Sequence, residues 1–150
     1  MKVTALGGCG AMGRATAWDL AENDAVDDLL VADADIDAAE EFAAELPGDV
    51  DTEYVDVTNH DQLVSVVEDS DVVANALPYK FNTDVMEACL DADAHYLDLG
   101  GLYHVTQDQL EYDDEFVEND LVAVLGMGAS PGMTNVAAAN GVEQLDAGEA

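Results

Sequence analysis

A glycine-rich segment near the start of the chain has the residue types and spacing that bind a diphosphate. It reads Gly8-Cys9-Gly10-Ala11-Met12-Gly13 and satisfies the pattern G-x-G-x-x-G. The segment directly follows an apolar stretch of strand length and opens a helix, which is the context in which this pattern binds dinucleotides. The glycines allow a tight turn, a close approach of the backbone to the pyrophosphate and close packing of the helix. We therefore expect residues 8–13 to hold a pyrophosphate at a helix N-terminus; the alternative is a glycine turn without a ligand.

A carboxylate follows where the adenosine ribose of such a dinucleotide would lie. Asp33 ends the second apolar stretch, 20 residues after Gly13, and a carboxylate at this position binds the ribose hydroxyls. It would repel the 2′-phosphate of NADP, and the four residues after it, Ala34-Asp35-Ile36-Asp37, include no cation. The pattern therefore favours NAD, while Arg14, next to the last glycine, leaves NADP possible. In so acidic a chain, Asp33 is alternatively a surface charge only.

Basic residues are so scarce that the position of each is informative. The chain has three, Lys2, Arg14 and Lys80, against 34 acids. If cations are retained where anions bind, Arg14 belongs to the pyrophosphate end of the site and Lys80, after the fourth apolar stretch, to the nicotinamide end. Lys2 has no evident partner, and a surface lysine is the alternative for Lys80. Lys80 and His104, which lies in a loop after two glycines, are weak catalytic candidates.

The scarcity of lysine and arginine excludes several enzyme classes. A Tyr-x-x-x-Lys pair, the dyad of short-chain reductases, would need a tyrosine where Ala76 stands. A P-loop needs a lysine within its glycine loop, and hydroxyacid dehydrogenases need an arginine for the substrate carboxylate, whereas the single arginine follows the glycine loop. The three histidines have no partner at metal-ligand spacing. We therefore expect no metal.

The net charge of −31 constrains the surroundings and partners of the protein. The acids are interleaved with apolar residues along the whole chain, which predicts a folded, halophile-type protein, because salt at ~1 M shortens the Debye length to ~3 Å. Binding to nucleic acid is not expected, since it needs clustered cations; an acidic mimic of a nucleic acid is the alternative. No apolar run approaches the ~18 residues of a membrane span, and the first residues do not resemble a signal peptide. We expect a cytoplasmic protein without membrane contact, and read Cys9 and Cys89 as small buried residues.

Apolar stretches of strand length alternate with amphipathic stretches of helix length throughout. Strands are expected at 3–6, 29–33, 54–57, 72–77, 95–99 and 121–125, and helices at 11–22, 36–46, 61–68, 82–90, 107–118 and 133–144. This alternation predicts an α/β protein with a doubly wound (Rossmann), mostly parallel sheet and helices on both faces. Such a sheet binds ligands at the carboxyl ends of its strands, where the glycine loop and Asp33 would meet.

Three segments together resemble the saccharopine dehydrogenase family. They are Gly7-Gly8-Cys9-Gly10-Ala11-Met12-Gly13-Arg14, then Asn75-Ala76-Leu77-Pro78 with a following helix and His95-Tyr96-Leu97-Asp98, and finally Gly128-Ala129-Ser130-Pro131-Gly132-Met133-Thr134-Asn135. They occur in order, at family spacing, over most of the chain. The resemblance implies reversible NAD(P)-linked oxidation of a secondary amine, with a C–N bond formed or cleaved between two amino-acid skeletons.

The resemblance also implies roles for residues that follow the third, fourth and fifth strands. Asp56 and Val57 would flank the adenine. The nicotinamide side would be formed by the loop Asn75, Ala76, Leu77 and Pro78. Asp98, at the mouth of the fifth strand, is a third weak catalytic candidate, with one more acid on the rim as the equal alternative.

The expected domain division places an NAD(P)-binding Rossmann domain in residues 1–130. Residues 131–150 would form a helix leading toward a substrate and dimerisation domain that is absent from this chain. The full-length protein would act on a small amino-acid-like imine or secondary amine, and the substrate itself stays open. A homodimer is one option for that full-length form. The alternative is a stand-alone nucleotide-binding module without catalytic activity.

Overall fold

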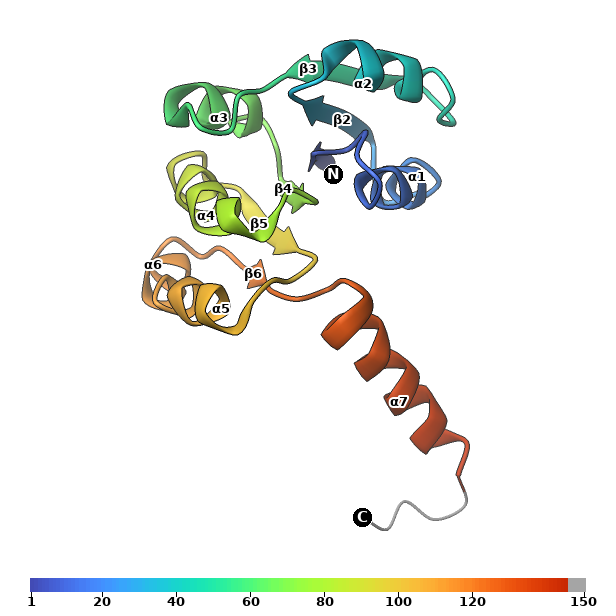
Figure 1. The fold of residues 1–150 in the computed structure, drawn as a ribbon, viewed down its shortest axis with the longest axis vertical. Coiled ribbons are helices and arrows are strands. Elements are labelled where there is room, and N and C mark those ends of the chain that lie inside the picture. The colour runs from blue at the N-terminus through green and yellow to red at the C-terminus, as the bar shows by residue number, and fades with distance from the viewer. Residues whose placement is uncertain (146–150) are drawn as a thin grey trace.

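A single six-stranded sheet organises the computed structural model, which describes residues 1–145 (Figure 1). Its strands are β1 (Lys2–Leu6), β2 (Asp28–Asp33), β3 (Val50–Tyr54), β4 (Val72–Asn75), β5 (His95–Asp98) and β6 (Ala123–Val124). All neighbouring pairs are parallel, in the order β3-β2-β1-β4-β5-β6. This order is that of the doubly wound Rossmann fold, so the predicted fold class is confirmed.

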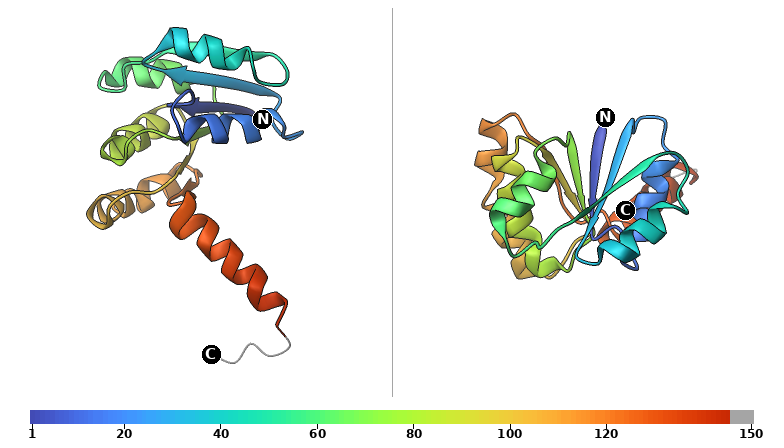
Figure 2. Two further views of the ribbon diagram at one scale, coloured as in Figure 1. Left: turned by 45° about the vertical axis from the view of Figure 1, so that its right-hand side comes forward. Right: turned by 90° about the horizontal axis from the view of Figure 1, so that it is seen from above.

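Helices lie on both faces of the sheet, as Figure 2 shows. On one face are α1 (Gly13–Ala21) and α2 (Ile36–Ala43), which contact β1, β2 and β3. The other face carries α3 (His60–Val67), α4 (Asn82–Asp91), α5 (Tyr103–Leu110) and α6 (Asp113–Glu118). A short 3-10 turn, η1 (Tyr79–Phe81), precedes α4, and an irregular helical turn, η2 (Ala129–Met133), leads into α7 (Thr134–Glu143).

Each face of the sheet has its own hydrophobic core, because residues alternate in direction along a strand. In β1, Val3 and Ala5 join the cluster beneath α1 and α2, whereas Leu6 joins the cluster beneath α3, α4 and α6. Phe42 and Tyr96 are the largest side chains of the two clusters that are almost completely buried. The near-continuous apolar strands of the sequence therefore reflect burial on both faces.

Two predicted elements are wrong. The third strand covers Val50–Tyr54 rather than 54–57, and it ends where its partner β2 ends, since Asp33 pairs with Tyr54. It is an edge strand with exposed acids, so it carries no apolar run. The predicted helix at 107–118 is two helices, α5 and α6, separated at residues 111–112. No helix among residues 1–145 is long and apolar enough to cross a membrane.

Candidate nucleotide-binding site

The glycine loop forms a compact turn between β1 and α1. The Gly7 N–H donates to the Ala32 carbonyl (2.8 Å), and the Gly10 N–H donates to the Gly7 carbonyl (3.0 Å). A Cβ atom built on Gly13 would lie 2.0 Å from the Gly7 carbonyl oxygen, so only glycine lets α1 start so close to the loop. The tight turn and the close helix packing predicted from the pattern are both present.

Gly10 differs from Gly13 in having space around it. A Cβ atom on Gly10 would meet a single neighbour, the Gly7 carbonyl oxygen, at 3.1 Å. The first turn of α1 contains no acid, and no side chain caps its N-terminus. The N–H groups of this helix start, with the positive end of the helix dipole, are therefore open to an anion at the loop.

Asp33 lies at the carboxyl end of β2, beside the glycine loop. Its Oδ1 accepts a hydrogen bond from the Asp35 N–H (3.2 Å). The Cys9 thiol lies close enough to donate to the Asp35 carbonyl (4.0 Å). Burial, together with a hydrogen bond to the Asp33 carboxylate, raises the pKa of Cys9 to about 11. Cys9 is thus a neutral thiol that packs between the loop and the acids after β2.

Arg14 reaches the same corner from α1. Its Nε donates to the Cys9 carbonyl (3.1 Å), and its guanidinium carbon lies 4.4 Å from the centroid of the Phe42 ring in α2. A hydrogen bond and a cation–π contact hold the guanidinium in one place. The structure therefore brings one carboxylate, Asp33, and one cation, Arg14, next to Cys9.

The loop after β4 meets the glycine loop at the point where the strand order reverses. The Ala76 N–H donates to the Leu6 carbonyl (2.9 Å), and a Cβ atom on Gly7 would lie 2.9 Å from the Leu77 side chain. Ligands of doubly wound sheets bind at this reversal, outside the carboxyl ends of the strands. Ala76 and Leu77 are half-buried there, and Pro78 is exposed.

Asp56 and Val57 lie after β3, on the same edge of the sheet as Asp33. The chain is held there by the Val55 N–H, which donates to the Asp33 carbonyl (3.1 Å). The Asp56 carboxylate accepts hydrogen bonds from the Thr58 N–H (3.0 Å) and hydroxyl (2.7 Å), and these bonds lower the pKa of Asp56. Both residues are half-buried, at the edge of the sheet where Asp33 also lies.

Asp98 is buried, with 1% of its surface exposed, and does not face the crevice as a free acid. Its Oδ2 accepts from the Tyr96 hydroxyl (2.9 Å), Asn82 Nδ2 (3.2 Å) and Gln109 Nε2 (2.6 Å). Burial, followed by the nearby Asp98 charge, raises the pKa of Tyr96 far above its usual range. Asn82 and Gln109 were not predicted from the sequence, in which their one signal is a polar residue on the buried face of a helix.

The second oxygen of Asp98 joins two loops. Its Oδ1 accepts from the Gly100 N–H (2.7 Å), after β5, and from the Gly126 N–H (2.8 Å), after β6. Five donors therefore converge on one carboxylate, which satisfies a buried charge without a cation. This placement gives Asp98 a positioning role at the carboxyl ends of β5 and β6.

The side chain of Asn75 belongs to the same buried network. Its Nδ2 donates to Asn82 Oδ1 (3.1 Å) and to the Tyr96 hydroxyl (3.2 Å), while its Oδ1 accepts from the Leu77 N–H (3.0 Å). Asn75 therefore shapes the loop after β4 through both ends of its amide. The network links β4, β5, α4 and α5.

Lys80 and His104 are both exposed, in η1 and in the first turn of α5. The Lys80 ammonium lies 4.5 Å from the centroid of the Phe81 ring. Within residues 1–145, no hydrogen bond or ion pair joins Lys80, His104 and Asp98 to one another. The structure does not assemble the three catalytic candidates into a cluster.

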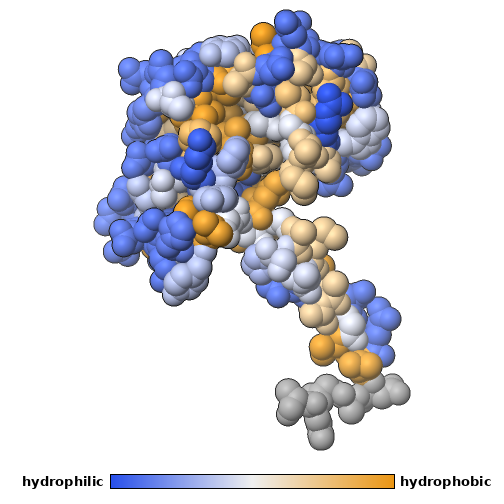
Figure 3. Space-filling view, in the orientation of Figure 1, coloured by the Kyte–Doolittle hydropathy of each residue, from blue (hydrophilic) through white to orange (hydrophobic). Residues whose placement is uncertain are grey.

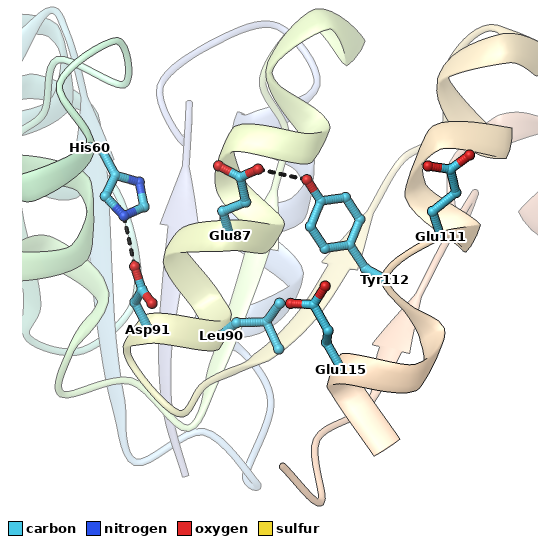
Figure 4. A pocket seen from close by; sticks show the side chains of 7 residues that line it. All are labelled: His60, Glu87, Leu90, Asp91, Glu111, Tyr112 and Glu115. Carbon is cyan, nitrogen blue, oxygen red and sulfur yellow. Dashed lines mark hydrogen bonds and ion pairs between the residues drawn. The ribbon is translucent and has the colours of Figure 1, made fainter. Parts of the chain in front are cut away.

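An acidic pocket of about 560 Å³ lies outside the crevice, over α3, α4 and the start of α6 (Figure 4). In it His60 Nε2 lies 2.7 Å from Asp91 Oδ2, and the Tyr112 hydroxyl donates to Glu87 (2.6 Å). That hydrogen bond and burial raise the pKa of Tyr112 to about 12. Among the described residues, no group of three or more His, Cys, Asp or Glu side chains could hold a metal ion. The pocket is part of the acidic surface.

Comparison with known proteins found a family and relatives that match most of this chain. Residues 3–124 match the family model described as the saccharopine dehydrogenase NADP binding domain. Carboxyaminopropylagmatine dehydrogenase of Synechocystis sp. is 30% identical over 139 residues, which cover 86% of this chain and 35% of that protein. Carboxynorspermidine synthase of Vibrio alginolyticus is 26% identical over 160 residues, covering 92% of this chain and 39% of that protein.

A similar fold occurs in the apo saccharopine dehydrogenase (L-Glu forming) of Saccharomyces cerevisiae. Its structure superimposes with a TM-score of 0.79 at 23% sequence identity, covering 95% of this chain and 31% of the yeast chain. This chain spans between three and four tenths of the length of these relatives. The matched residues include the glycine loop and all six strands, and they establish that the chain belongs to the family of saccharopine dehydrogenase NADP-binding domains.

Proposed function

We propose that this chain binds a nicotinamide dinucleotide as the cofactor domain of an oxidoreductase. One observation carries the proposal: the glycine loop, the uncapped start of α1 and the loop after β4 meet in a single region at the reversal of strand order. In it, residues 8–14 would hold the pyrophosphate, Asp33 the adenosine ribose, and Asp56 and Val57 the adenine. The nicotinamide would lie against residues 75–78.

We infer a preference for NAD over NADP, although the family description names NADP. Asp33 would accept hydrogen bonds from both ribose hydroxyls, and it would repel a 2′-phosphate. Arg14 is the one cation near this corner in the described residues, and its Nε is engaged by the Cys9 carbonyl. A single stacked guanidinium has to offset Asp33, Asp35 and Asp37, so the local charge favours the cofactor without the phosphate.

The reaction that we propose is hydride transfer between the nicotinamide and a secondary amine or imine of an amino-acid-like molecule. The names of two relatives refer to amine-containing compounds, carboxyaminopropylagmatine and carboxynorspermidine. The cofactor supplies the hydride chemistry when bound, and the protein orients it. Residues 1–130 would form the cofactor domain, and residues from 131 onward would lead toward a substrate domain of the full-length protein.

The binding claim is testable with one glycine. Gly10→Ala adds a methyl group with one close protein neighbour, at 3.1 Å, so the fold should persist while the approach to the pyrophosphate is blocked. We expect NADH affinity to fall about tenfold or more, measured by NADH fluorescence in molar KCl. Gly141→Ala, in α7 with nothing within 4 Å of the added Cβ, is the matched control. Absence of NADH binding by the unaltered chain would contradict the proposal.

We expect the 150-residue chain to bind the cofactor but not to catalyse the reaction, because the substrate contacts would lie in another domain of the full-length protein. Holding an amine in near-attack geometry over the nicotinamide can supply ~7–11 kcal/mol of the barrier, and Lys80 and His104 are exposed side chains without described partners across the crevice. Saccharopine and carboxynorspermidine oxidation, followed as NADH formation, are the assays. Turnover near that of a full-length relative would place the catalytic residues within this chain.

A further inference from the structure

The face of the sheet that carries α1 and α2 is covered over only half of its width. α1 and α2 contact β1, β2 and β3, whereas the strands β4 to β6 border an apolar groove of about 700 Å³ on that face. Its floor contains Val72, Leu97, Val122 and Val124, and Met12 and Met133 line its sides. A doubly wound sheet is ordinarily buried on both faces. On this face, however, no helix of the described residues covers β4 to β6.

The charge that marks the rest of the surface is missing from this region. Acids occupy 34 of the 150 positions, yet Asp19 is the single acid that lines the groove. None of the 22 residues from Leu121 to Val142 carries a charge. That stretch includes β6 and all of α7 except its last residue, Glu143, and α7 has no buried residue. An uncharged surface on so acidic a protein is expected where protein, and not solvent, covers it.

The uncharged surface is also exposed. Val122 is 56% exposed, Met133 69% and Val136 64%. Figure 3 shows hydrophobic residues at the surface where α7 leaves the body of the domain. Contiguous apolar patches of this kind mark interaction sites in soluble proteins.

We propose that this groove binds one amphipathic α-helix from another part of the full-length protein, and that this helix completes the layer begun by α1 and α2. The inference rests on the proposed function, in which the domain works within a longer polypeptide; the relatives are between two and a half and three and a half times its length. Three strands at a spacing of ~4.8 Å span ~10 Å, and a helix is ~10–12 Å across. The groove therefore has room for one helix, whose apolar face lies on Val72, Leu97 and Val124.

A second copy of the chain fits the groove less well. Each copy would bring a net charge of −31, and like charge opposes association. A helix of the same polypeptide is favoured by its high effective concentration near the groove.

The test uses the 150-residue chain in molar KCl and a synthetic helical peptide as the probe. The peptide is about 15 residues long, with leucines on one face and glutamines elsewhere, so that no charge drives binding. Fluorescence anisotropy of the labelled peptide should show one site per chain. Val122→Asp, on the groove floor, should weaken binding about tenfold or more. Val117→Asp, at a valine of α6 that is 70% exposed outside the groove, should leave it unchanged.

Three results would overturn the inference: no peptide binding, equal weakening by both substitutions, or a dimer that Val122→Asp abolishes in sedimentation velocity. The dimer would make a second copy the occupant. NADH titration of the same samples separates this inference from the proposed function. Val122 precedes β6, at the end of the sheet opposite the glycine loop, so Val122→Asp should leave NADH affinity unchanged, and NADH failure with intact peptide binding would count against the cofactor site alone.

Discussion

Replacing Asp98 by asparagine tests the buried network with a single atom. The change keeps the shape of the side chain but exchanges one acceptor oxygen for an NH₂ donor. In the native protein, five donors point at the two oxygens, between 2.6 and 3.2 Å away. Whichever way the amide turns, its NH₂ faces N–H or O–H groups, because only donors surround Asp98. The new side chain therefore leaves at least two donors without an acceptor.

The expected change in the free energy of unfolding follows from the hydrogen bonds that those donors lose. If the amide nitrogen faces Gly100 and Gly126, two backbone N–H groups lose their acceptor, and each buried unsatisfied group costs ~1–3 kcal/mol. If it faces Tyr96, Asn82 and Gln109, these side chains can partly rearrange. We expect a loss of ~3 kcal/mol in the free energy of unfolding, about 6–12 °C in Tm for a domain of this size.

Thermal unfolding by circular dichroism in molar KCl measures this loss. Asp108→Asn is the matched control: it makes the same substitution at an exposed site on α5, where we expect a change within ~0.5 kcal/mol. A Tm for Asp98→Asn within about 1 °C of the control would refute the reasoning, and it would mean that the network tolerates a neutral amide.

Three further predictions concern salt, a thiol and the glycine loop. The net charge of −31 predicts that the folded state loses stability as the screening salt is removed. Far-UV circular dichroism across a KCl series should show loss of structure toward ~0.1 M. Equal stability at ~0.1 M and ~2 M KCl would contradict salt adaptation. Because the pKa of Cys9 is raised to about 11 in the folded chain, from its usual 9.0, alkylation by iodoacetamide should have its midpoint near pH 11. The folded chain holds this proton more tightly, so the stability that it contributes is complete below about pH 9 and falls as the pH rises toward about 11. A labelling midpoint near pH 9 would show an unburied thiol. Gly13→Ala should unfold the domain or displace the loop, since its Cβ would lie 2.0 Å from the Gly7 oxygen, and an unchanged Tm would exclude that contact.

Local signals explain why the fold was predictable. Buried strands such as β1 and β4 consist mostly of apolar residues, and the glycine pattern marks the junction of β1 and α1 without reference to distant residues. β3 was misplaced because an edge strand with exposed Asp51 and Glu53 has no apolar pattern. The α5–α6 break was missed because the helical pattern continues across it.

Site residues were predictable from the sequence only where their position at the end of a strand was enough to place them. Asp33 lies at the carboxyl end of β2, as its spacing from the glycine loop predicts. Asp98 also ends a strand, but its burial depends on Asn82 and Gln109, which come from two helices. The apolar groove was not predictable either, since a strand has the same sequence whether or not a helix covers it.

The cofactor preference is tested most directly by titrating NADH and NADPH against the same protein. In molar KCl, we expect NADH to bind about tenfold more tightly than NADPH, because the proposed binding mode would place the 2′-phosphate beside the Asp33 carboxylate. Asp33→Ser should weaken NADH binding and narrow the difference between the two cofactors. Tighter binding of NADPH by the unaltered chain would contradict the proposed role of Asp33 and assign the dominant charge at this corner to Arg14.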